Sequence, residues 1–271
     1  QRMSFSISGK TAIVTGASSG IGLAIGKKFA AAGANVMFAD MDEAALIDQL
    51  GEPGEDSNLR LFGGDLREKL TIANLLSATL DAFDEVDILV NGARRVVQSD
   101  PLNAEDDTVN ELLTQNVMPT LRLSQQVARR MIKQGESRSE EDESPLGSII
   151  NLSSIAARRT HPELMGYAIA TAAMDQMTRS LAVALAPKRI RVNSIAIGSV
   201  MSASMKEILK ENRGYRKDVE DHTPLGRVAS PTELTDAAQF LASDAAGFMT
   251  GQIMTLDGGR TLLDSVTAPV H

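Results

Sequence analysis

The residues with the clearest chemical potential in this sequence are three glycines, Gly16, Gly20 and Gly22. They follow the apolar run at residues 12–14 and precede a helix-length segment. In a turn of this kind one glycine permits the sharp bend, one lets the backbone approach a pyrophosphate, and one allows close packing of helix on strand. The N-terminus of the following helix offers free N–H groups and a positive dipole end to phosphates. This spacing predicts a dinucleotide site, and a glycine turn without a ligand is the alternative.

Asp40 stands at the end of the next strand-like run, eighteen residues after Gly22. A carboxylate here can accept hydrogen bonds from an adenosine ribose, and it would repel a 2′-phosphate. Neither Ser18 nor Ser19 supplies a basic side chain that would bind such a phosphate. These residues favour NAD over NADP, and an aspartate that merely ends a strand is the alternative.

Strand-like apolar runs alternate with helix-length segments along the whole chain. Several runs are continuously apolar, as expected for strands that are buried on both faces. The alternation implies a parallel sheet with helices on both faces, and neither a linker nor a repeat divides the sequence. We therefore expect one α/β domain over residues 1–271, of the doubly wound Rossmann type, with about seven strands. The expected strands are 11–15, 35–39, 59–63, 86–91, 148–152, 191–196 and 253–256, and the expected helices include 21–32, 66–83, 108–133, 165–186 and 231–243.

Three segments have a distinctive composition. Residues 165–186 are apolar nearly all round, which predicts a helix covered on both sides, by the sheet and in addition by another subunit. Residues 135–147, GESRSEEDESPLG, are charged and contain a proline. They predict an exposed, mobile loop, with an acidic regulatory surface as the alternative. Residues 199–222 interrupt the alternation and mix methionine, leucine and tyrosine with charges. Pro231, after the potential cap Ser230, marks the start of the last expected helix.

Composition narrows the classes of function. Of the 271 residues, 43% are hydrophobic and 23% are charged, as in an ordinary globular protein. No run of eighteen apolar residues predicts a membrane span, and residues 1–5 lack the apolar region of a signal peptide, so we expect a cytoplasmic protein. The absence of cysteine excludes disulfides and thiolate nucleophiles, and with only three histidines no metal site is expected. A net charge of −8 argues against nucleic-acid binding.

The glycine turn belongs to a longer motif. Residues 15–22 read T-G-A-S-S-G-I-G, and a second motif, residues 167–171, reads Y-A-I-A-T. Together they resemble the short-chain dehydrogenase/reductase family, in particular its 3-oxoacyl-carrier-protein reductases, whose second motif runs from a tyrosine to a lysine four residues later. In this sequence Thr171 stands at the lysine position. Further matches, which extend the resemblance over nearly the whole chain, lie at residues 64–66, 223–227 and 256–259.

The resemblance implies where a dinucleotide would lie. Asp65 would contact the adenine ring, although its position alone is also typical of a helix N-cap. After the fourth strand the family has N-N-A-G. Asn91 and Ala93 fit that pattern, whereas Arg94 replaces the final glycine and brings a long cation near the cofactor. The implied cofactor-binding residues are Gly16, Ser18, Ser19, Gly20, Ile21, Gly22, Asp40, Asp65, Leu66, Asn91, Ala93, Tyr167, Gly198 and Val200.

The resemblance also implies hydride transfer between C4 of a nicotinamide and the carbon of a secondary alcohol or ketone. Tyr167 would exchange the matching proton, and Ser154 would orient the substrate oxygen, with the neighbouring Ser153 as the residue most easily confused with it. Asn116, in the middle of an expected helix, would hold a proton-relay water. Residues 199–222 would form a lid over the substrate.

The lysine of the family hydrogen-bonds the nicotinamide ribose, and its charge lowers the pKa of the tyrosine. An unperturbed tyrosine has a pKa of about 10, so only about one part in a thousand is ionised at pH 7. A cation ~4 Å away at an effective dielectric constant of about 20 contributes ~4 kcal/mol, or about three pKa units. Thr171 offers a hydroxyl to the ribose but no charge, so we expect alcohol oxidation to suffer more than carbonyl reduction.

Two interpretations follow. In the first, the protein is an active NAD(H)-dependent oxidoreductase of a secondary alcohol or ketone, and a guanidinium stands in for the lysine charge, that of Arg94 before that of Arg95 or Arg158. In the second, it is a catalytically inactive dinucleotide-binding protein that serves as a sensor or as an oligomer partner. We favour the enzyme, as a homodimer or homotetramer built on residues 165–186. His161 is expected to face solvent rather than substrate.

Overall fold

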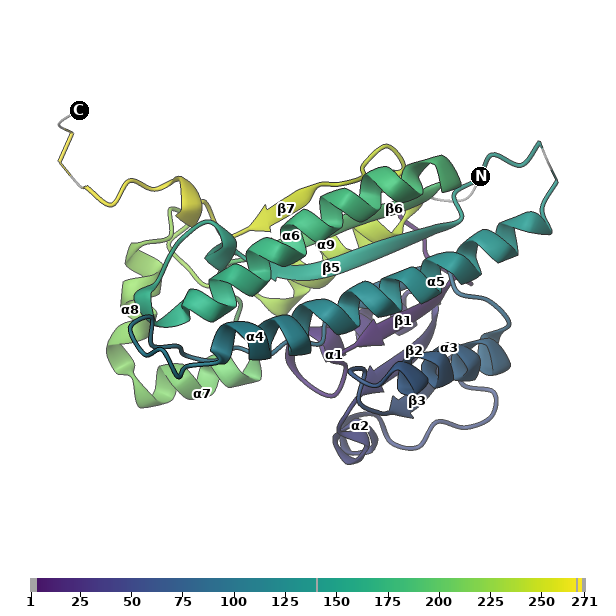
Figure 1. The fold of residues 1–271 in the computed structure, drawn as a ribbon, viewed down its shortest axis with the longest axis horizontal. Helices are drawn as coiled ribbons and strands as arrows, with labels where there is room; N and C mark the ends of the chain where they lie inside the picture. The colour runs from purple at the N-terminus through teal and green to yellow at the C-terminus, as the bar shows by residue number, and fades with distance from the viewer. Residues whose placement is uncertain (1–3, 140, 267, 270–271) are drawn as a thin grey trace.

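Parallel strands form the centre of the protein. In the computed structural model, which describes residues 4–139, 141–266 and 268–269, the strands lie in the order β3-β2-β1-β4-β5-β6-β7, and every neighbouring pair is parallel (Figure 1). The doubly wound α/β fold predicted from the alternation is confirmed. The strands are β1 (Thr11–Thr15), β2 (Asn35–Asp40), β3 (Leu59–Gly63), β4 (Ile88–Asn91), β5 (Gly147–Ser154), β6 (Ile190–Ile197) and β7 (Ile253–Leu256).

Helices cover both faces of the sheet. Ala12 and Val14 of β1 belong to the apolar cluster that contains α1 and α9, whereas Ile13 belongs to the cluster that contains α3, α5 and α6. Because successive side chains of a strand point to opposite faces, burial on both sides explains why the strands read as continuous apolar runs. The helices are α1 (Gly20–Ala31), α2 (Glu43–Leu50), α3 (Lys69–Phe83), α4 (Thr108–Leu112), α5 (Met118–Glu136), α6 (Met165–Leu185), α7 (Ala203–Glu211), α8 (Arg213–Asp221) and α9 (Pro231–Ala242).

The strand order determines where a ligand can lie. β1 lies between β2 and β4, so the chain first builds the sheet in one direction, to β3, and then in the other, from β4 to β7. At such a reversal, the carboxyl ends of the neighbouring strands leave a crevice. The residues at and after the ends of β1, β2, β4 and β5 therefore meet at one edge of the sheet, among them Gly16, Asp40, Asn91 and Ser154.

One predicted helix is interrupted. The expectation of a single helix over residues 108–133 is wrong in its middle, because α4 gives way to a π-helical turn at Leu113–Val117 before α5 continues through Glu136. Pro119 explains the widening, since its nitrogen cannot donate to the carbonyl four residues earlier. Asn116 lies in this turn and not in a regular helix.

The boundaries of the other helices differ less from the predicted ones. The short helix α2 was not predicted, and α3 begins at Lys69 rather than at residue 66. The N-cap interpretation of Asp65 is therefore wrong, and its carboxylate instead accepts a hydrogen bond from the backbone N–H of Arg67 within a turn. α9 begins at Pro231 directly after Ser230, as predicted.

The two irregular segments are partly as expected. Residues 199–222 contain two short helices, α7 and α8, which lie at the carboxyl end of the strands (Figure 1). The predicted loop over residues 135–147 is shorter, because α5 runs through Glu136 and β5 begins at Gly147. Most of its described side chains are exposed, but Leu146 is buried, and residue 140 lies outside the described residues.

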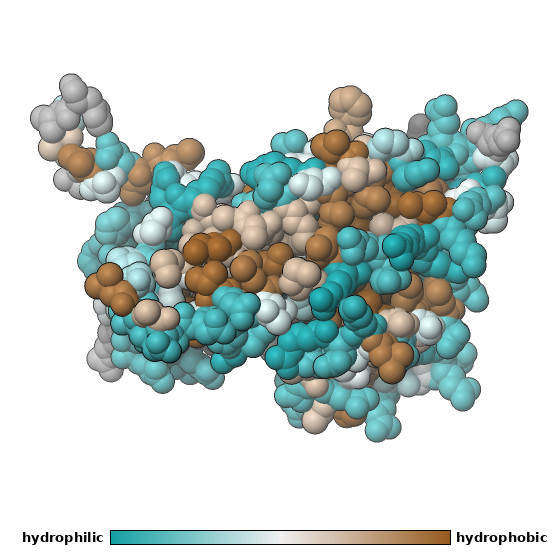
Figure 2. Space-filling model, viewed as in Figure 1, coloured by the Kyte–Doolittle hydropathy of each residue, from teal (hydrophilic) through white to brown (hydrophobic). Residues whose placement is uncertain are grey.

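α6 is buried on one side only. Tyr167, Thr171 and Met174 face the interior, whereas Ile169 and Val183 are 42% and 78% exposed. The sheet side of α6 is buried as predicted, and the predicted cover of its other side by another subunit stays a prediction. Figure 2 shows hydrophobic residues gathered over this helix. An exposed apolar face of this kind is typical of an interaction surface.

None of the helices within the described residues combines the length and the apolar character that a membrane crossing requires. Within the same ranges no three His, Asp or Glu side chains converge in a way that could hold a metal ion.

Candidate active site

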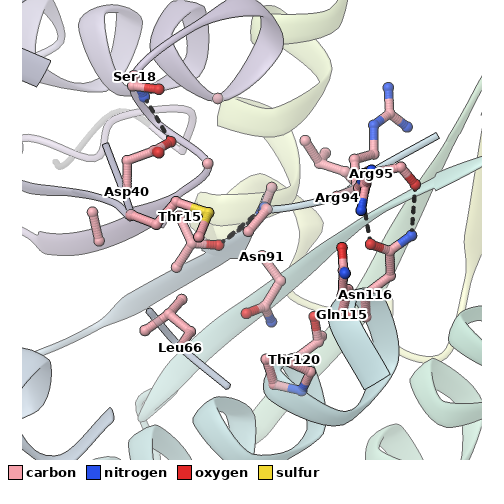
Figure 3. Close-up of a pocket in the computed structure, with 18 of the residues that line it drawn as sticks. Thr15, Ser18, Asp40, Leu66, Asn91, Arg94, Arg95, Gln115, Asn116 and Thr120 are labelled. Atoms are coloured by element: carbon pink, nitrogen blue, oxygen red, sulfur yellow. Dashed lines mark hydrogen bonds between the residues drawn. The ribbon is translucent and has the colours of Figure 1, made fainter. Parts of the chain in front are cut away.

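A cavity of about 700 Å³ opens at the carboxyl edge of the sheet (Figure 3). It extends from the glycine turn after β1, past the ends of β2, β3 and β4, to the π-helical turn before α5. Of the predicted cofactor-binding residues, all line it except Tyr167, Gly198 and Val200. The lining residues are 15–16, 18–22, 39–41, 64–67, 91–96, 115–116, 119–120, 123, 152 and 202.

The glycine turn is built by contacts between backbones. A Cβ atom on Gly22 would lie 2.2 Å from the carbonyl oxygen of Gly16, and one on Gly16, whose φ is +64°, would lie 2.7 Å from the backbone of Gly92. A Cβ on Gly92 would in turn lie 2.5 Å from the carbonyl oxygen of Thr15. The Thr15 hydroxyl also accepts hydrogen bonds from the N–H groups of Gly92 and Ala93. The ends of β1 and β4 are thus locked together, which keeps the turn open toward the cavity. The roles of Thr15 and Gly92 were not predicted.

Asp40 lies at the end of β2, on the cavity wall. Its carboxylate accepts hydrogen bonds from the backbone N–H of Ser18 at 3.1 Å and of Asp42 at 3.0 Å. It therefore also holds the glycine turn in place. A carboxylate has about four lone-pair sites, so it can still accept from the hydroxyls of a ribose.

Asp65 and Leu66 form the wall beyond β3. The Arg67 guanidinium donates to both oxygens of Asp65: Nη2 and Nε lie 2.6 and 2.9 Å from Oδ2, and Nε lies 3.0 Å from Oδ1. This hydrogen bond lowers the pKa of Asp65 from its ordinary value. The Arg67 side chain, which was not predicted at the site, therefore shares the wall expected to meet the adenine.

The two asparagines of the site have their side chains occupied by protein groups. Asn91 is buried and donates to Asn151 Oδ1 at 2.9 Å and to Ser124 Oγ at 3.1 Å. Asn116 accepts from the N–H of Arg95 and donates to its carbonyl oxygen, both at 2.9 Å (Figure 3). The side-chain amide of Asn116 thus holds the chain after β4.

The structure separates Ser154 from Ser153 at the end of β5. Ser153 is fully buried and donates to the carboxylate of Asp175 at 2.6 Å. Burial raises the pKa of Asp175, and this partner in α6 was not predicted. Ser154 is only partly buried, and its hydroxyl oxygen accepts from the N–H of Ala156 at 3.1 Å. Of the two serines, Ser154 is the one whose proton is free for a ligand.

Tyr167 and Thr171 lie on the inner face of α6, one turn apart. Tyr167 is buried, and its hydroxyl lies 3.4 Å from Nη1 of Arg94. The Thr171 hydroxyl donates to the carbonyl oxygens of Tyr167 and Ala168, at 2.9 and 3.0 Å. Its proton is therefore used within the helix and is not offered to a ribose.

Three arginines had been considered as replacements for the lysine charge, and their positions differ. Arg94 lines the cavity and contacts Tyr167. Arg95 pairs with Glu111, and Arg158 donates to the hydroxyl of Thr255. Of the three, Arg94 alone bonds the tyrosine.

The remaining predicted residues lie beside the cavity. Gly198 donates to the carbonyl oxygen of Leu256 at 2.7 Å and has no room for a Cβ against Asp257. Val200 is buried next to Ala229. His161 is exposed, as expected, and its Nδ1 accepts from the N–H of Glu163.

The donor set fits a nicotinamide dinucleotide. The glycine turn lines the cavity at the N-terminus of α1, where a pyrophosphate would be stabilised. A carboxylate stands at the end of β2 for a ribose, and hydroxyls at Ser154 and Tyr167 suit proton transfer. Fold and cavity together define a dinucleotide-binding α/β oxidoreductase.

Comparisons with known proteins agree with this geometry. A family model described as enoyl-(acyl carrier protein) reductase matches residues 16–261. Galactitol 2-dehydrogenase (L-tagatose-forming) from Cereibacter sphaeroides is 34% identical over 264 residues, which cover 96% of this chain and 98% of the relative. The 7α-hydroxysteroid dehydrogenase of Escherichia coli is 32% identical over 256 residues, which cover 93% and 94% of the two chains.

Solved structures give the same result. A 7α-hydroxysteroid dehydrogenase in complex with NADH and 7-oxoglycochenodeoxycholic acid has a TM-score of 0.81 at 31% identity, over 94% of this chain and 96% of that one. A gluconate 5-dehydrogenase from Burkholderia cenocepacia in complex with NADP and tartrate has a TM-score of 0.83 at 28% identity, over 96% and 98%. This chain belongs to the short-chain dehydrogenase/reductase family. It is an oxidoreductase of the hydride-transferring kind. The two solved relatives hold nicotinamide dinucleotides, NADH in one and NADP in the other.

Proposed function

We propose that the protein transfers hydride between NAD(H) and the carbon of a secondary alcohol or ketone, with Tyr167 as acid and base and Ser154 orienting the substrate oxygen. One observation carries the proposal. Ser154 accepts a hydrogen bond from Ala156, and Tyr167 accepts one from Arg94, so each hydroxyl keeps its own proton for a ligand oxygen. Two such donors polarise a carbonyl group and supply the proton that its reduction needs.

The reduction adds one hydride and one proton to the carbonyl group. The reduced nicotinamide, when bound, supplies a hydride to the carbonyl carbon. Tyr167 gives its proton to the carbonyl oxygen, which leaves an alcohol and a phenolate beside Arg94. A proton from solvent then restores the phenol. In the oxidation the phenolate accepts the proton of the alcohol, so the same residue serves both directions.

Asp40 supports NAD as the preferred cofactor. Its carboxylate lies on the cavity wall, and Met41, which follows it there, carries no charge that would attract a 2′-phosphate. The solved relatives differ in this respect, since one was solved with NADH and the other with NADP. The preference therefore rests on the residues at the end of β2.

Substrate and assembly complete the proposal. The named relatives act on a hexitol and on a hydroxysteroid, and both names describe a hydroxyl at a secondary carbon. We infer that a small alcohol or ketone is the substrate here, beneath the lid at residues 199–222. The exposed apolar face of α6 supports a homodimer or homotetramer, and we place the enzyme in the cytoplasm.

A second candidate function has one observation in its favour. Thr171 supplies no charge, and its hydroxyl proton is used within α6. A family member without turnover, which binds the dinucleotide as a sensor or as the partner in an oligomer, would show this feature.

Binding and turnover distinguish the two. We expect calorimetry to give tighter binding of NADH than of NADPH, and a panel of keto sugars and oxosteroids to contain a ketone that the protein reduces. Tyr167→Phe should abolish that reduction and leave NADH binding unchanged. NADH binding with no reduction of any ketone by the unmodified protein would favour the sensor. Equal binding of both cofactors would contradict the NAD preference.

A further inference from the structure

The position that carries a lysine in the family contributes no cation in this protein. Thr171 is buried, and its hydroxyl donates to the carbonyl oxygens of Tyr167 and Ala168. A lysine at this position would serve two groups, the tyrosine hydroxyl and the nicotinamide ribose. Both groups need another donor if the protein is to work as proposed.

Arg94 reaches the tyrosine hydroxyl from the loop after β4 and also lines the cavity. Its Nη1 lies 3.4 Å from the hydroxyl of Tyr167 and 3.1 Å from the carbonyl oxygen of Ser153. The same side chain lines the cavity in which the dinucleotide fits. All of its bonds to described residues run through Nη1, which leaves Nε and Nη2 for a ligand in that cavity.

The backbone on both sides of Arg94 is held in place by its neighbours. On its N-terminal side, Gly92 is locked against Thr15. On its C-terminal side, the backbone of Arg95 makes two hydrogen bonds with Asn116. With a fixed backbone and an Nη1 that bonds Ser153 and Tyr167, the Arg94 side chain has less freedom to lose when a ligand binds, which favours an organised site over a mobile surface arginine.

We propose that Arg94 takes over both tasks of the missing lysine, as a positioning residue for Tyr167 and as a donor to the nicotinamide half of the cofactor. The inference rests on the proposed function. A guanidinium is charged at every relevant pH and stabilises a phenolate at hydrogen-bond distance. Its hydrogen bond also turns the phenol proton away from Arg94, toward the substrate.

The other charged groups around Tyr167 do not substitute for Arg94. Asp175 on α6 is reached only through Ser153, and its charge would oppose a phenolate. Glu111 on α4 is paired with Arg95. Arg158, after the short turn that follows β5, donates to Thr255 on β7.

The role of Arg94 in cofactor binding can be tested without turnover, by comparing the affinity for NADH with the affinity for ADP. ADP carries the adenosine and pyrophosphate but lacks the nicotinamide half. We expect Arg94→Met to weaken NADH binding about tenfold or more and to change ADP binding less than about twofold. Arg94→Lys, which keeps the charge, should restore part of the NADH affinity. The matched control is Arg130→Met in α5, where the guanidinium bonds the carbonyl of Asp84, before β4 and so at the other edge of the sheet.

The effect of Arg94 on Tyr167 can be measured separately, by spectroscopy. The chain contains two tyrosines and no tryptophan, so Tyr215→Phe leaves Tyr167 as the single tyrosine. In that background we expect the ultraviolet absorbance of tyrosinate to appear at higher pH once Arg94→Met is added. Addition of Thr171→Lys to the Arg94→Met protein should reverse the change.

The outcomes separate the inference from the proposed function. Unchanged NADH affinity in Arg94→Met, or an unchanged tyrosinate titration, overturns the role of Arg94 even if the protein is a good reductase. If Arg94→Met changes both the NADH affinity and the tyrosinate titration but the protein reduces no ketone, the role of Arg94 is supported. Only the proposed function is then contradicted. Circular dichroism of Arg94→Met excludes loss of fold, and Arg94→Lys provides the test if the methionine variant does not fold.

Discussion

The two ends of the cavity are built by different means. At the glycine turn the contacts join backbone to backbone: Gly16, Gly22 and Gly92 approach so closely that a single methyl group would collide with a carbonyl oxygen or an amide. At the other end, side chains from three elements meet. Arg94 comes from the loop after β4, Ser154 from the end of β5 and Tyr167 from α6.

The difference explains which parts of the family pattern this chain keeps. A backbone contact specifies the residue type at its own position, so the glycine turn has no substitute elsewhere in the chain. A charge acts through space and can arrive from any element within a few ångströms. The lysine position is therefore open to change, provided that another cation reaches the same place.

The largest expected effect falls on the side-chain end. We expect Tyr167→Phe to lower kcat for ketone reduction by about 10²–10⁴-fold, because the phenol proton is the one transferred. The affinity for NADH, measured by calorimetry, should remain within about twofold, since the dinucleotide cavity is not lined by Tyr167. A kcat that the substitution leaves unchanged would remove Tyr167 from the mechanism.

Gly22→Ala tests the backbone end. A Cβ atom 2.2 Å from the Gly16 carbonyl forces the turn apart, and we expect the free energy of unfolding to fall by about 1–3 kcal/mol. NADH binding should be lost in the same variant. Gly54→Ala is the matched control, because no atom lies within 4 Å of a Cβ at that position and its φ is not positive. Thermal denaturation and calorimetry of both variants check the prediction, and equal behaviour would contradict the backbone argument.

Asp40→Asn sharpens the comparison within the cofactor site. The amide keeps an oxygen for the Ser18 N–H but loses the charge that favours ribose hydroxyls and repels a phosphate. We expect NADH to bind about tenfold more weakly and NADPH to bind relatively better, as hydrogen bonds to charged groups are worth about 1.5–3 kcal/mol. Asp48→Asn, on the exposed side of α2, should leave both affinities unchanged. An unchanged ratio of the two affinities in Asp40→Asn would place the source of cofactor preference elsewhere.

The smallest expected effect concerns Asp175, behind the side-chain end. Burial raises the pKa of this carboxyl above its ordinary value of 3.8. A raised pKa means that the folded state favours the protonated form, so its contribution to stability is present below pH 3.8 and is lost as the pH rises through the folded pKa. The side chain at position 175 in the Asp175→Asn variant does not titrate. The free energy of unfolding of this variant, relative to that of the unmodified protein, should therefore rise as the pH increases from acid to neutral. Denaturant unfolding over that range measures the difference, and parallel curves would contradict it.

The sequence predicted the scaffold well for a physical reason. β1, β3 and β7 were found with their observed ends. β1 is buried on both faces and therefore continuously apolar, whereas the outer strands β3 and β7 are only partly buried. The glycine turn could be predicted equally well, because the spacing of its glycines reflects contacts among neighbouring residues. α2 was missed because eight residues carry a weak periodic signal.

The side-chain end of the cavity could be predicted from the sequence only in part. Ser154 and Tyr167 could be proposed from a motif, but their bonding partners are 2 and 73 residues away. Neither the π-helical turn at Asn116 nor the hydrogen bonds of its amide with the backbone of Arg95, 21 residues earlier, was predicted. Pro119 was the one available signal for that distortion.

By itself, the sequence determined the order of strands and helices, the phosphate-binding turn and the loss of a lysine at position 171. These features depend on apolar periodicity and on residue types at fixed local spacing. Tertiary structure alone decided that the Thr171 proton turns into its own helix and that Arg94, not Arg95 or Arg158, meets Tyr167. Those contacts join elements far apart in the chain, and their geometry exists only after the sheet has brought the ends of β4 and β5 and the start of α6 to one edge.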